Sequence, residues 1–101
     1  MTDKSSLRVG VIGLGTVGSG LVRTLQRNRD RIARNAGMPI DLVAVADINP
    51  DTFSRLDLAG IETTSDAGRI IRDERIDCVA ELIGGTGIAR DIVRDAFRAG
   101  K

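Results

Sequence analysis

The segment that most constrains the fold is RVGVIGLGTVGSGLVRTL, residues 8–25. There an apolar run of strand length passes through four glycines in eight positions and continues as a helical pattern. Glycine loses more backbone entropy on folding than other residues and packs no side chain, so glycines between two regular elements need a compensating role. Gly13, Gly15 and Gly18 form G-x-G-x-x-G as GLGTVG. The pattern is informative here because it follows a predicted strand and opens a predicted helix.

The three glycines have different predicted roles. Gly13 permits a tight turn, Gly15 lets the backbone approach a diphosphate, and Gly18 lets helix and strand pack closely. The backbone N–H groups near Thr16 and Val17 are expected to face the phosphates, where the helix dipole contributes up to about 2 kcal/mol. We therefore predict a dinucleotide-binding turn. The alternative is an ordinary strand–helix turn with surplus glycine.

The rest of the chain alternates strand and helix patterns. This order implies right-handed crossovers and a parallel sheet with helices on both faces. We predict an α/β fold, a Rossmann-type open sheet of about four strands in the order 3-2-1-4, with a ligand at the switch point between strands one and four. The predicted elements are strands at 7–12, 41–47, within 61–66 and at 76–85, and helices at 16–36, from Thr64 or Ser65 through Ile71, and at 86–99.

Periodicity also assigns residues to the core. Gly20 is predicted to serve helix–sheet packing, and Cys78 to be a small core residue. The side chains predicted to face inward from the first and last helices are Val17, Leu21, Leu25, Ile88, Ile92, Val93 and Phe97.

Asp47 ends the second strand, after LVAVA, and is the predicted acid that bonds the adenosine ribose. It follows Gly18 by 29 residues, against about 20 in the usual pattern, and the long first helix with the GMP turn accounts for the excess. The alternative is a turn aspartate at a strand end. A carboxylate repels a 2′-phosphate, so Asp47 favours NAD. Arg55 is the nearest downstream residue that could hold that phosphate, and both NAD and NADP stay open.

The segment ELIGGT, residues 81–86, ends the last strand beside the glycine turn. Its backbone is expected to border the middle or the nicotinamide side of the cofactor. The alternative for Gly84 and Gly85 is a loop before a helix that Thr86 caps. Glu81 is a charge within an apolar strand, so it is expected to be bound by backbone amides or an arginine, and no catalytic role is assigned to it.

Composition limits the chemistry further. The chain of 101 residues has no His, Trp or Tyr, and its lysines are Lys4 and Lys101. These absences exclude a His-based triad, a His metal site and aromatic stacking platforms for bases. A net charge of +1 gives no argument for nucleic acid or a membrane as partner. One cysteine fits a reducing cytoplasm. We predict no catalytic or metal-ligating residue, and expect the chain to act by binding.

With these residues in place, the chain resembles the N-terminal nucleotide-binding region of homoserine dehydrogenase. The resemblance is carried by VGVIGLGTVGSGLVRTL, NRDRIARNAGMPIDLVAVAD and IDCVAELIGGTGIARDIVRDAFRAGK. It implies NAD(P)-dependent interconversion of homoserine and aspartate 4-semialdehyde, an oxidoreductase step in threonine, methionine and isoleucine biosynthesis. By position it implies cofactor contacts from Leu14, Thr16 and Val17, and places Gly84, Gly85 and Thr86 near the nicotinamide end.

Two departures from the family stand out. Gly87 and Ile88 occupy positions where members typically carry any residue and then proline. The lysine-bearing TANK segment, the substrate domain and the dimer interface have no counterpart in the sequence. The polar start of the chain, MTDKSSLRVG, lacks the apolar stretch of a signal peptide and predicts a disordered lead-in at 1–6. The resemblance implies a partial NAD(P)-binding Rossmann domain at 7–101, truncated before the later strands.

Such a fragment is expected to be inactive alone, and its last strand to expose an edge that favours weak self-association. Two other functions stay open at this point. One is a free-standing NAD(H)-sensing regulatory module. The other is the cofactor domain of a different amino-acid dehydrogenase.

Overall fold

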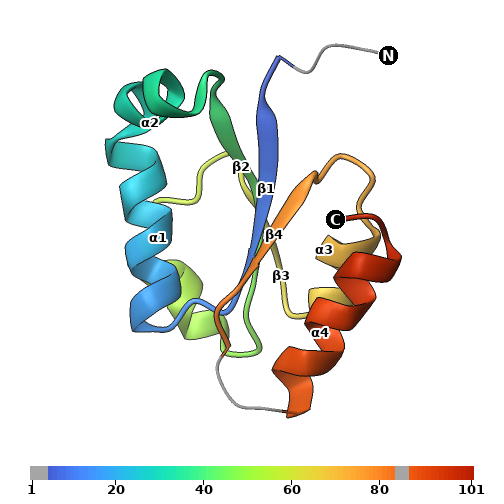
Figure 1. Ribbon diagram of the computed structural model, residues 1–101. Helices are drawn as coiled ribbons and strands as arrows, with labels where there is room; N and C mark the ends of the chain where they lie inside the picture. The colour runs from blue at the N-terminus through green and yellow to red at the C-terminus, as the bar shows by residue number, and fades with distance from the viewer. Residues whose placement is uncertain (1–4, 84–86) are drawn as a thin grey trace.

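The computed structural model describes residues 5–83 and 87–101 and contains one parallel sheet in the order β3-β2-β1-β4 (Figure 1). The strands are β1 (Leu7–Ile12), β2 (Ile40–Ala46), β3 (Glu62–Thr64) and β4 (Cys78–Glu81). The α/β class, the parallel pairing and the strand order are therefore confirmed. Residues 1–4 of the predicted lead-in lie outside the described residues.

Helices cover both faces of the sheet (Figure 1). One face carries α1 (Thr16–Arg27) and α2 (Arg29–Ala36), with the short 3₁₀ helix η1 (Pro50–Arg55) packed nearby through Phe53. The other face carries α3 (Ala67–Arg72) and α4 (Gly87–Arg98). A sheet covered on both faces needs apolar side chains on both sides of its central strands, which explains the nearly continuous apolar runs of β1 and β2.

Each face has its own hydrophobic core, because successive strand side chains point to opposite sides of a sheet. On the α1 side the buried side chains are Val9, Val11, Leu14, Val22 and Val45. On the side of α3 and α4 they are Ile12, Ala44, Ala46, Ile70, Ile71, Ile76, Ile92 and Ala96.

The predicted long helix at 16–36 is wrong in one respect, because the structure has two helices that meet at Asn28. Asn28 has non-helical dihedral angles (φ −112°, ψ 27°), and both its backbone N–H and its side-chain amide donate to the carbonyl of Thr24. Asparagine side chains compete in this way with regular helix hydrogen bonds. The predicted stop is confirmed: Gly37 ends α2 with φ +82°.

The predicted inward face of the first helix is only partly correct, because Leu21 packs against the core and Val17 does not. Val17 is 68% exposed, whereas Val22 is fully buried. Gly18 packs against the carbonyl of Gly13 in the turn after β1, and the buried row continues one turn later at Val22. A Cβ on Gly20 would have nothing within 4 Å, so the predicted role of this glycine in helix–sheet packing is wrong.

Three of the four inward side chains predicted for the last helix are exposed. Only Ile92 packs in the core, whereas Ile88 is 69%, Val93 40% and Phe97 73% exposed. Cys78, predicted to be a core residue, is exposed as well. Within the described part of the chain α4 packs against β4 and α3, so a single helical row faces the core and the neighbouring apolar row stays uncovered.

Candidate functional site

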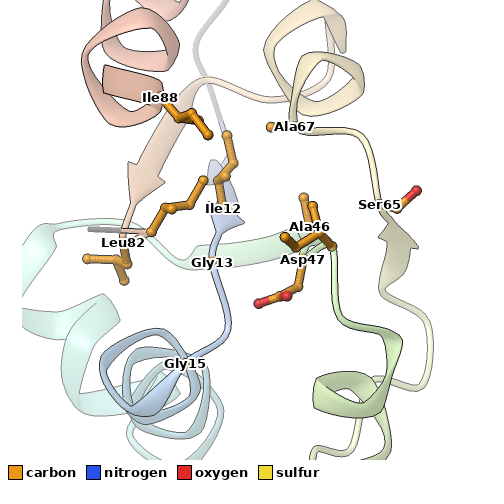
Figure 2. Close-up of a pocket in the computed structure, with 11 residues that line it drawn as sticks. Ile12, Gly13, Gly15, Ala46, Asp47, Ser65, Ala67, Leu82 and Ile88 are labelled. Atoms are coloured by element: carbon orange, nitrogen blue, oxygen red, sulfur yellow. The ribbon is translucent and has the colours of Figure 1, made fainter. Parts of the chain in front are cut away.

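A cleft of about 310 Å³ lies at the edge of the sheet where the parallel strands end (Figure 2). Because all four strands run in one direction, the segments that follow β1, β2, β3 and β4 meet there. The residues that line it are Ile12, Gly13, Gly15, Ala46, Asp47, Ile48, Ser65, Ala67, Leu82, Ile83 and Ile88.

The glycine turn between β1 and α1 forms one wall of this cleft. Gly13 has φ +96°, and a Cβ there would lie 2.9 Å from the backbone nitrogen of Ile83. A Cβ on Gly18 would collide with the carbonyl oxygen of Gly13. Gly15 is different: it is exposed and has nothing within 4 Å of its Cβ position. Gly13 and Gly18 are therefore required by the close backbone packing of the turn, whereas Gly15 leaves open space in front of the backbone.

The first turn of α1 presents backbone donors that the fold does not use. Gly15 is the N-cap and contributes no side-chain hydrogen bond, and no acidic side chain lies in the first turn. Within residues 5–83 and 87–101 the structure gives the N–H groups of Thr16 and Val17 no acceptor. Unpaired N–H groups and the positive end of the helix dipole together favour an anion at this position.

Asp47 faces this turn from the end of β2. Its Oδ2 accepts a hydrogen bond from the N–H of Leu14 at 2.7 Å, and its Oδ1 accepts one from the N–H of Asn49 at 2.8 Å. Figure 2 shows the carboxylate on the side of the cleft that faces the glycine turn. A carboxylate has about four acceptor positions, so Asp47 is fixed in orientation and can still accept further hydrogen bonds.

Leu14 contributes to the site through its backbone. Its side chain is buried in the core at 1% exposure, and its N–H is engaged by Asp47. Its carbonyl accepts a hydrogen bond from Oγ of the buried Ser19 at 2.9 Å. Hydrogen bonds at both the N–H and the carbonyl of Leu14 thus fix the backbone of the GLGTVG segment at this residue.

The remainder of the cleft is apolar. Ile48 is 89% and Ile83 45% exposed, and both lie on its lining. Ile88 comes from α4 and Leu82 from the segment after β4 (Figure 2). The hydroxyl of Ser65 points away from Asp47 in the same view. A concave apolar surface with a few polar groups on one side is the usual composition of a small-molecule site.

Glu81 shapes the turn after β4. Its Oε1 accepts a hydrogen bond from the N–H of Ile83 at 2.6 Å, which confirms the expected backbone partner. The N–H of Leu82 donates to the carbonyl of Ile12 at 2.8 Å and ties this segment to β1. The predicted contacts from Gly84, Gly85 and Thr86 lie outside the described residues.

The apolar part of the cleft was not identified from the sequence. Ile48 and Ile83 each follow the last residues of a strand, and Ile88 was assigned to the core. The signal that could have found Ile48 and Ile83 is a large apolar side chain two residues after a strand that ends at the sheet's ligand-binding edge.

Metal-ligating clusters and membrane-spanning helices are both absent from the part of the chain that the structure describes. No group of three or more His, Cys, Asp or Glu side chains there could hold a metal ion. None of the described helices combines the length and apolar character that crossing a membrane requires.

Comparison with known families gives one match over most of the chain. The profile of the family described as "Homoserine dehydrogenase, NAD binding domain" matches residues 13–101. Among relatives, homoserine dehydrogenase from Methylobacillus glycogenes is 44% identical over 95 residues, which are 94% of this chain and 23% of that protein. The Bacillus subtilis enzyme is 33% identical over 96 residues, 95% of this chain and 22% of that protein. The chain thus spans about a quarter of its relatives' length or less.

Solved structures agree with this match. A homoserine dehydrogenase from Thiobacillus denitrificans has a TM-score of 0.86 and 41% sequence identity, covering 95% of this chain and 22% of that one. The Staphylococcus aureus enzyme has a TM-score of 0.83 at 28% identity, with 95% and 24% covered. A scyllo-inositol dehydrogenase from Lactobacillus casei, solved with bound NAD(H), shares the fold alone: its TM-score is 0.74 at 19% identity, with 95% and 26% covered.

Proposed function

The chain belongs to the homoserine dehydrogenase family, as its NAD-binding domain, and from this premise we propose that its cleft binds a nicotinamide dinucleotide against the first turn of α1. The diphosphate lies at the N–H groups of Thr16 and Val17, where Gly15 leaves room for it. The single observation that carries this proposal is the pairing of an open glycine with unused backbone donors at one wall of the cleft.

Asp47 accepts hydrogen bonds from the hydroxyls of the adenosine ribose. Its two hydrogen bonds to backbone N–H groups hold the carboxylate in place before the ligand arrives, which lowers the entropy cost of binding. Leu14 positions Asp47 through one of these bonds, and Gly13 and Gly18 keep the turn closed.

The nicotinamide end lies toward the segment after β4. Leu82, Ile83 and Ile88 provide apolar contacts there and keep water away from the ring. We include Gly84, Gly85 and Thr86 in the same proposal, on the basis of the family resemblance. When bound, the nicotinamide supplies or accepts the hydride in an alcohol–aldehyde interconversion.

We propose that NAD is preferred over NADP. A 2′-phosphate would lie beside the Asp47 carboxylate, and that carboxylate cannot turn away without breaking its bonds to Leu14 and Asn49. Arg55 is exposed on η1 and does not line the cleft, so a 2′-phosphate has no cation among the described lining residues.

The interconversion of homoserine and aspartate 4-semialdehyde is proposed for the longer polypeptide of which such a domain is part. The relatives are more than four times as long as the segment that matches this chain, and we expect the 101 residues to bind cofactor without turnover. We place this activity in the cytoplasm, with no nucleic acid or membrane as partner, in keeping with one cysteine and a net charge of +1.

The test uses Gly15→Ala. The backbone at Gly15 (φ −68°, ψ −159°) suits any residue, and its Cβ meets nothing in the protein. The variant is therefore expected to have the same denaturation midpoint as wild type. It is expected to bind NADH at least about tenfold more weakly in calorimetry, because the added methyl group occupies space that the ligand needs. Gly20→Ala, also without a neighbour at its Cβ position, is the matched control. Wild-type affinity in Gly15→Ala would contradict the proposed diphosphate position.

A further inference from the structure

Two buried hydroxyl groups bind backbone next to the cleft without lining it. Ser19 of α1 is 8% exposed and Thr52 of η1 is 6% exposed, and no other polar side chain in the ranges 5–83 and 87–101 is buried. Neither residue lines the cleft. Burying a hydroxyl costs free energy unless it forms a hydrogen bond, and an apolar side chain would fill the same space without that cost. The role of these two residues therefore follows from the groups that their hydroxyls bind.

Both hydroxyls donate to carbonyls that lie outside their own helices. Oγ of Ser19 donates to the carbonyl of Leu14 at 2.9 Å, in the glycine turn before α1. Oγ1 of Thr52 donates to the carbonyl of Asn49 at 2.8 Å, the residue that precedes η1. Serine and threonine often bond a carbonyl three or four residues back, but the partner of Ser19 lies five residues back. Each bond therefore ties a helix to the segment that leads into it.

The same two segments hold the Asp47 carboxylate. The N–H of Leu14 donates to its Oδ2 at 2.7 Å, and the N–H of Asn49 donates to its Oδ1 at 2.8 Å. Each carboxylate oxygen is thus bound by a residue whose carbonyl is bound in turn by a buried hydroxyl. The two chains of hydrogen bonds start on different helices, with Ser19 on α1 and Thr52 on η1, and they meet at one carboxylate.

We propose that Ser19 and Thr52 are positioning residues that set the preference for NAD over NADP by fixing the orientation of Asp47. This inference rests on the proposed function, in which Asp47 accepts hydrogen bonds from the adenosine ribose. A hydroxyl that holds the carbonyl of Leu14 or Asn49 also restricts the N–H of the same residue, because the two groups flank one Cα. The carboxylate consequently keeps a single orientation.

A fixed carboxylate separates the two cofactors for a simple electrostatic reason. It accepts from the ribose hydroxyls of NADH without rearrangement, which keeps the entropy cost of binding low. A 2′-phosphate meets the same negative charge and is tolerated only if the carboxylate turns away. Removing either hydroxyl frees one of the two segments that hold Asp47, so the carboxylate can turn. NADPH binding is then expected to improve relative to NADH binding.

The ratio of the Kd for NADPH to the Kd for NADH, measured by calorimetry, tests the proposal. Thr52→Val removes the hydroxyl but keeps the shape of the side chain, and is expected to lower this ratio at least about threefold. Thr52→Ser restores the hydroxyl and is expected to restore the wild-type ratio. Ser54→Ala is the matched control on the same helix, because Oγ of Ser54 also donates to a carbonyl three residues back, that of Asp51 at 2.8 Å. The N–H of Asp51 binds the Asn49 side chain and not Asp47, so Ser54→Ala is expected to keep the wild-type ratio.

Ser19→Ala tests the second hydroxyl from the other helix and is expected to lower the ratio in the same direction. A double-mutant cycle then separates positioning from a general loss of structure. In an Asp47→Ala background neither Ser19→Ala nor Thr52→Val has a carboxylate to release, so both are expected to leave the ratio where Asp47→Ala alone places it. A purely structural effect would change the ratio in both backgrounds.

Amide hydrogen exchange of the cofactor-free protein gives a readout that does not depend on binding. Thr52→Val is expected to speed exchange of the Asn49 N–H at least about threefold, and more than that of the Leu14 N–H. Ser19→Ala is expected to do the reverse. If Asp47→Ala lowers the cofactor ratio but Thr52→Val or Ser19→Ala leaves it unchanged, the inference is overturned and the proposed function stands. If Asp47→Ala itself leaves the ratio unchanged, the assignment of Asp47 to the ribose fails, and this inference fails with it.

Discussion

Gly18 and Gly20 lie two residues apart on α1 and have opposite surroundings. A Cβ on Gly18 would collide with the Gly13 carbonyl, whereas Gly20 has open space around its Cβ position. Gly18→Ala is therefore expected to lower the free energy of unfolding by about 1–3 kcal/mol. Gly20→Ala is expected to raise it by up to about 1 kcal/mol, because alanine is the better helix former.

Urea unfolding of both variants measures these two changes side by side. Since the substitution and the helix are the same, helix propensity cancels in the comparison. If both variants gained stability, the close approach of α1 to the turn would be contradicted.

Asp47 is the residue proposed to decide the preference for NAD over NADP. Asp47→Ala removes the proposed ribose acceptor, and is expected to weaken NADH binding about tenfold or more while changing NADPH binding much less. Asp57→Ala is the matched control, since Asp57 also accepts a backbone hydrogen bond, from Ala59 at 3.3 Å, in an exposed turn. Calorimetric titration with both cofactors gives the comparison. Equal losses for NADH and NADPH would contradict the assignment of Asp47 to the ribose.

At the level of single residues, the sequence predicted the position of Asp47 but not how it is held. A residue type at a strand end is visible in the sequence, whereas its bond to the N–H of Leu14, 33 residues away along the chain, depends on tertiary structure. Gly10 is a similar case: a Cβ there would lie 2.5 Å from Cγ2 of Ile70, and no local pattern relates these two residues.

At the scale of elements, the segment between α3 and β4 is held by charges. Asp73 accepts hydrogen bonds from Arg75 through Nη2 at 2.6 Å and Nε at 3.0 Å. The side-chain hydrogen bond from Arg75 lowers the pKa of Asp73 to about 2 from its ordinary 3.8. Because the pKa is lower in the folded state, this stabilisation is present above the ordinary pKa and is lost as pH falls toward about 2.

Arg75→Ala is accordingly expected to flatten the dependence of stability on pH between about 4 and about 2. Thermal unfolding midpoints across that range measure the slope. Arg98→Ala is the control, because Arg98 is an exposed arginine that forms no ion pair with the described residues. A wild-type slope in Arg75→Ala would show that Asp73 does not contribute to acid sensitivity.

Most helices and strands could be predicted from the sequence, but some of the residues at which they begin or end could not. The parallel sheet follows from the alternation of strands and helices, and the end of α2 follows from Gly37. The break at Asn28 did not follow, because the helical period continues across it on both sides. The start of α3 was placed at Thr64 or Ser65, whereas the side chain of Asp66 caps it by accepting from Gly68 at 2.9 Å. Several neighbouring polar residues can cap a helix, and packing selects one.

At the scale of the whole molecule, the sheet carries two apolar surfaces that the chain's own core does not cover. The cleft proposed to bind the cofactor lies at the ends of the strands, and the groove of β4 and α4 lies along the side of the sheet. Periodicity identified Val93 and Phe97 as apolar positions on a helix, but not what they face. Which apolar row is covered depends on the neighbours of α4 in three dimensions.

The cofactor site as a whole depends on the unused N–H groups at the start of α1, which are proposed to hold the diphosphate. Heteronuclear NMR of the ¹⁵N-labelled chain during titration with NADH observes each of these backbone N–H groups separately. We predict saturable shifts that are largest at Thr16 and Val17 and extend to Asp47. Saturable binding that leaves these signals in place, or no binding at millimolar NADH, would contradict the proposed site.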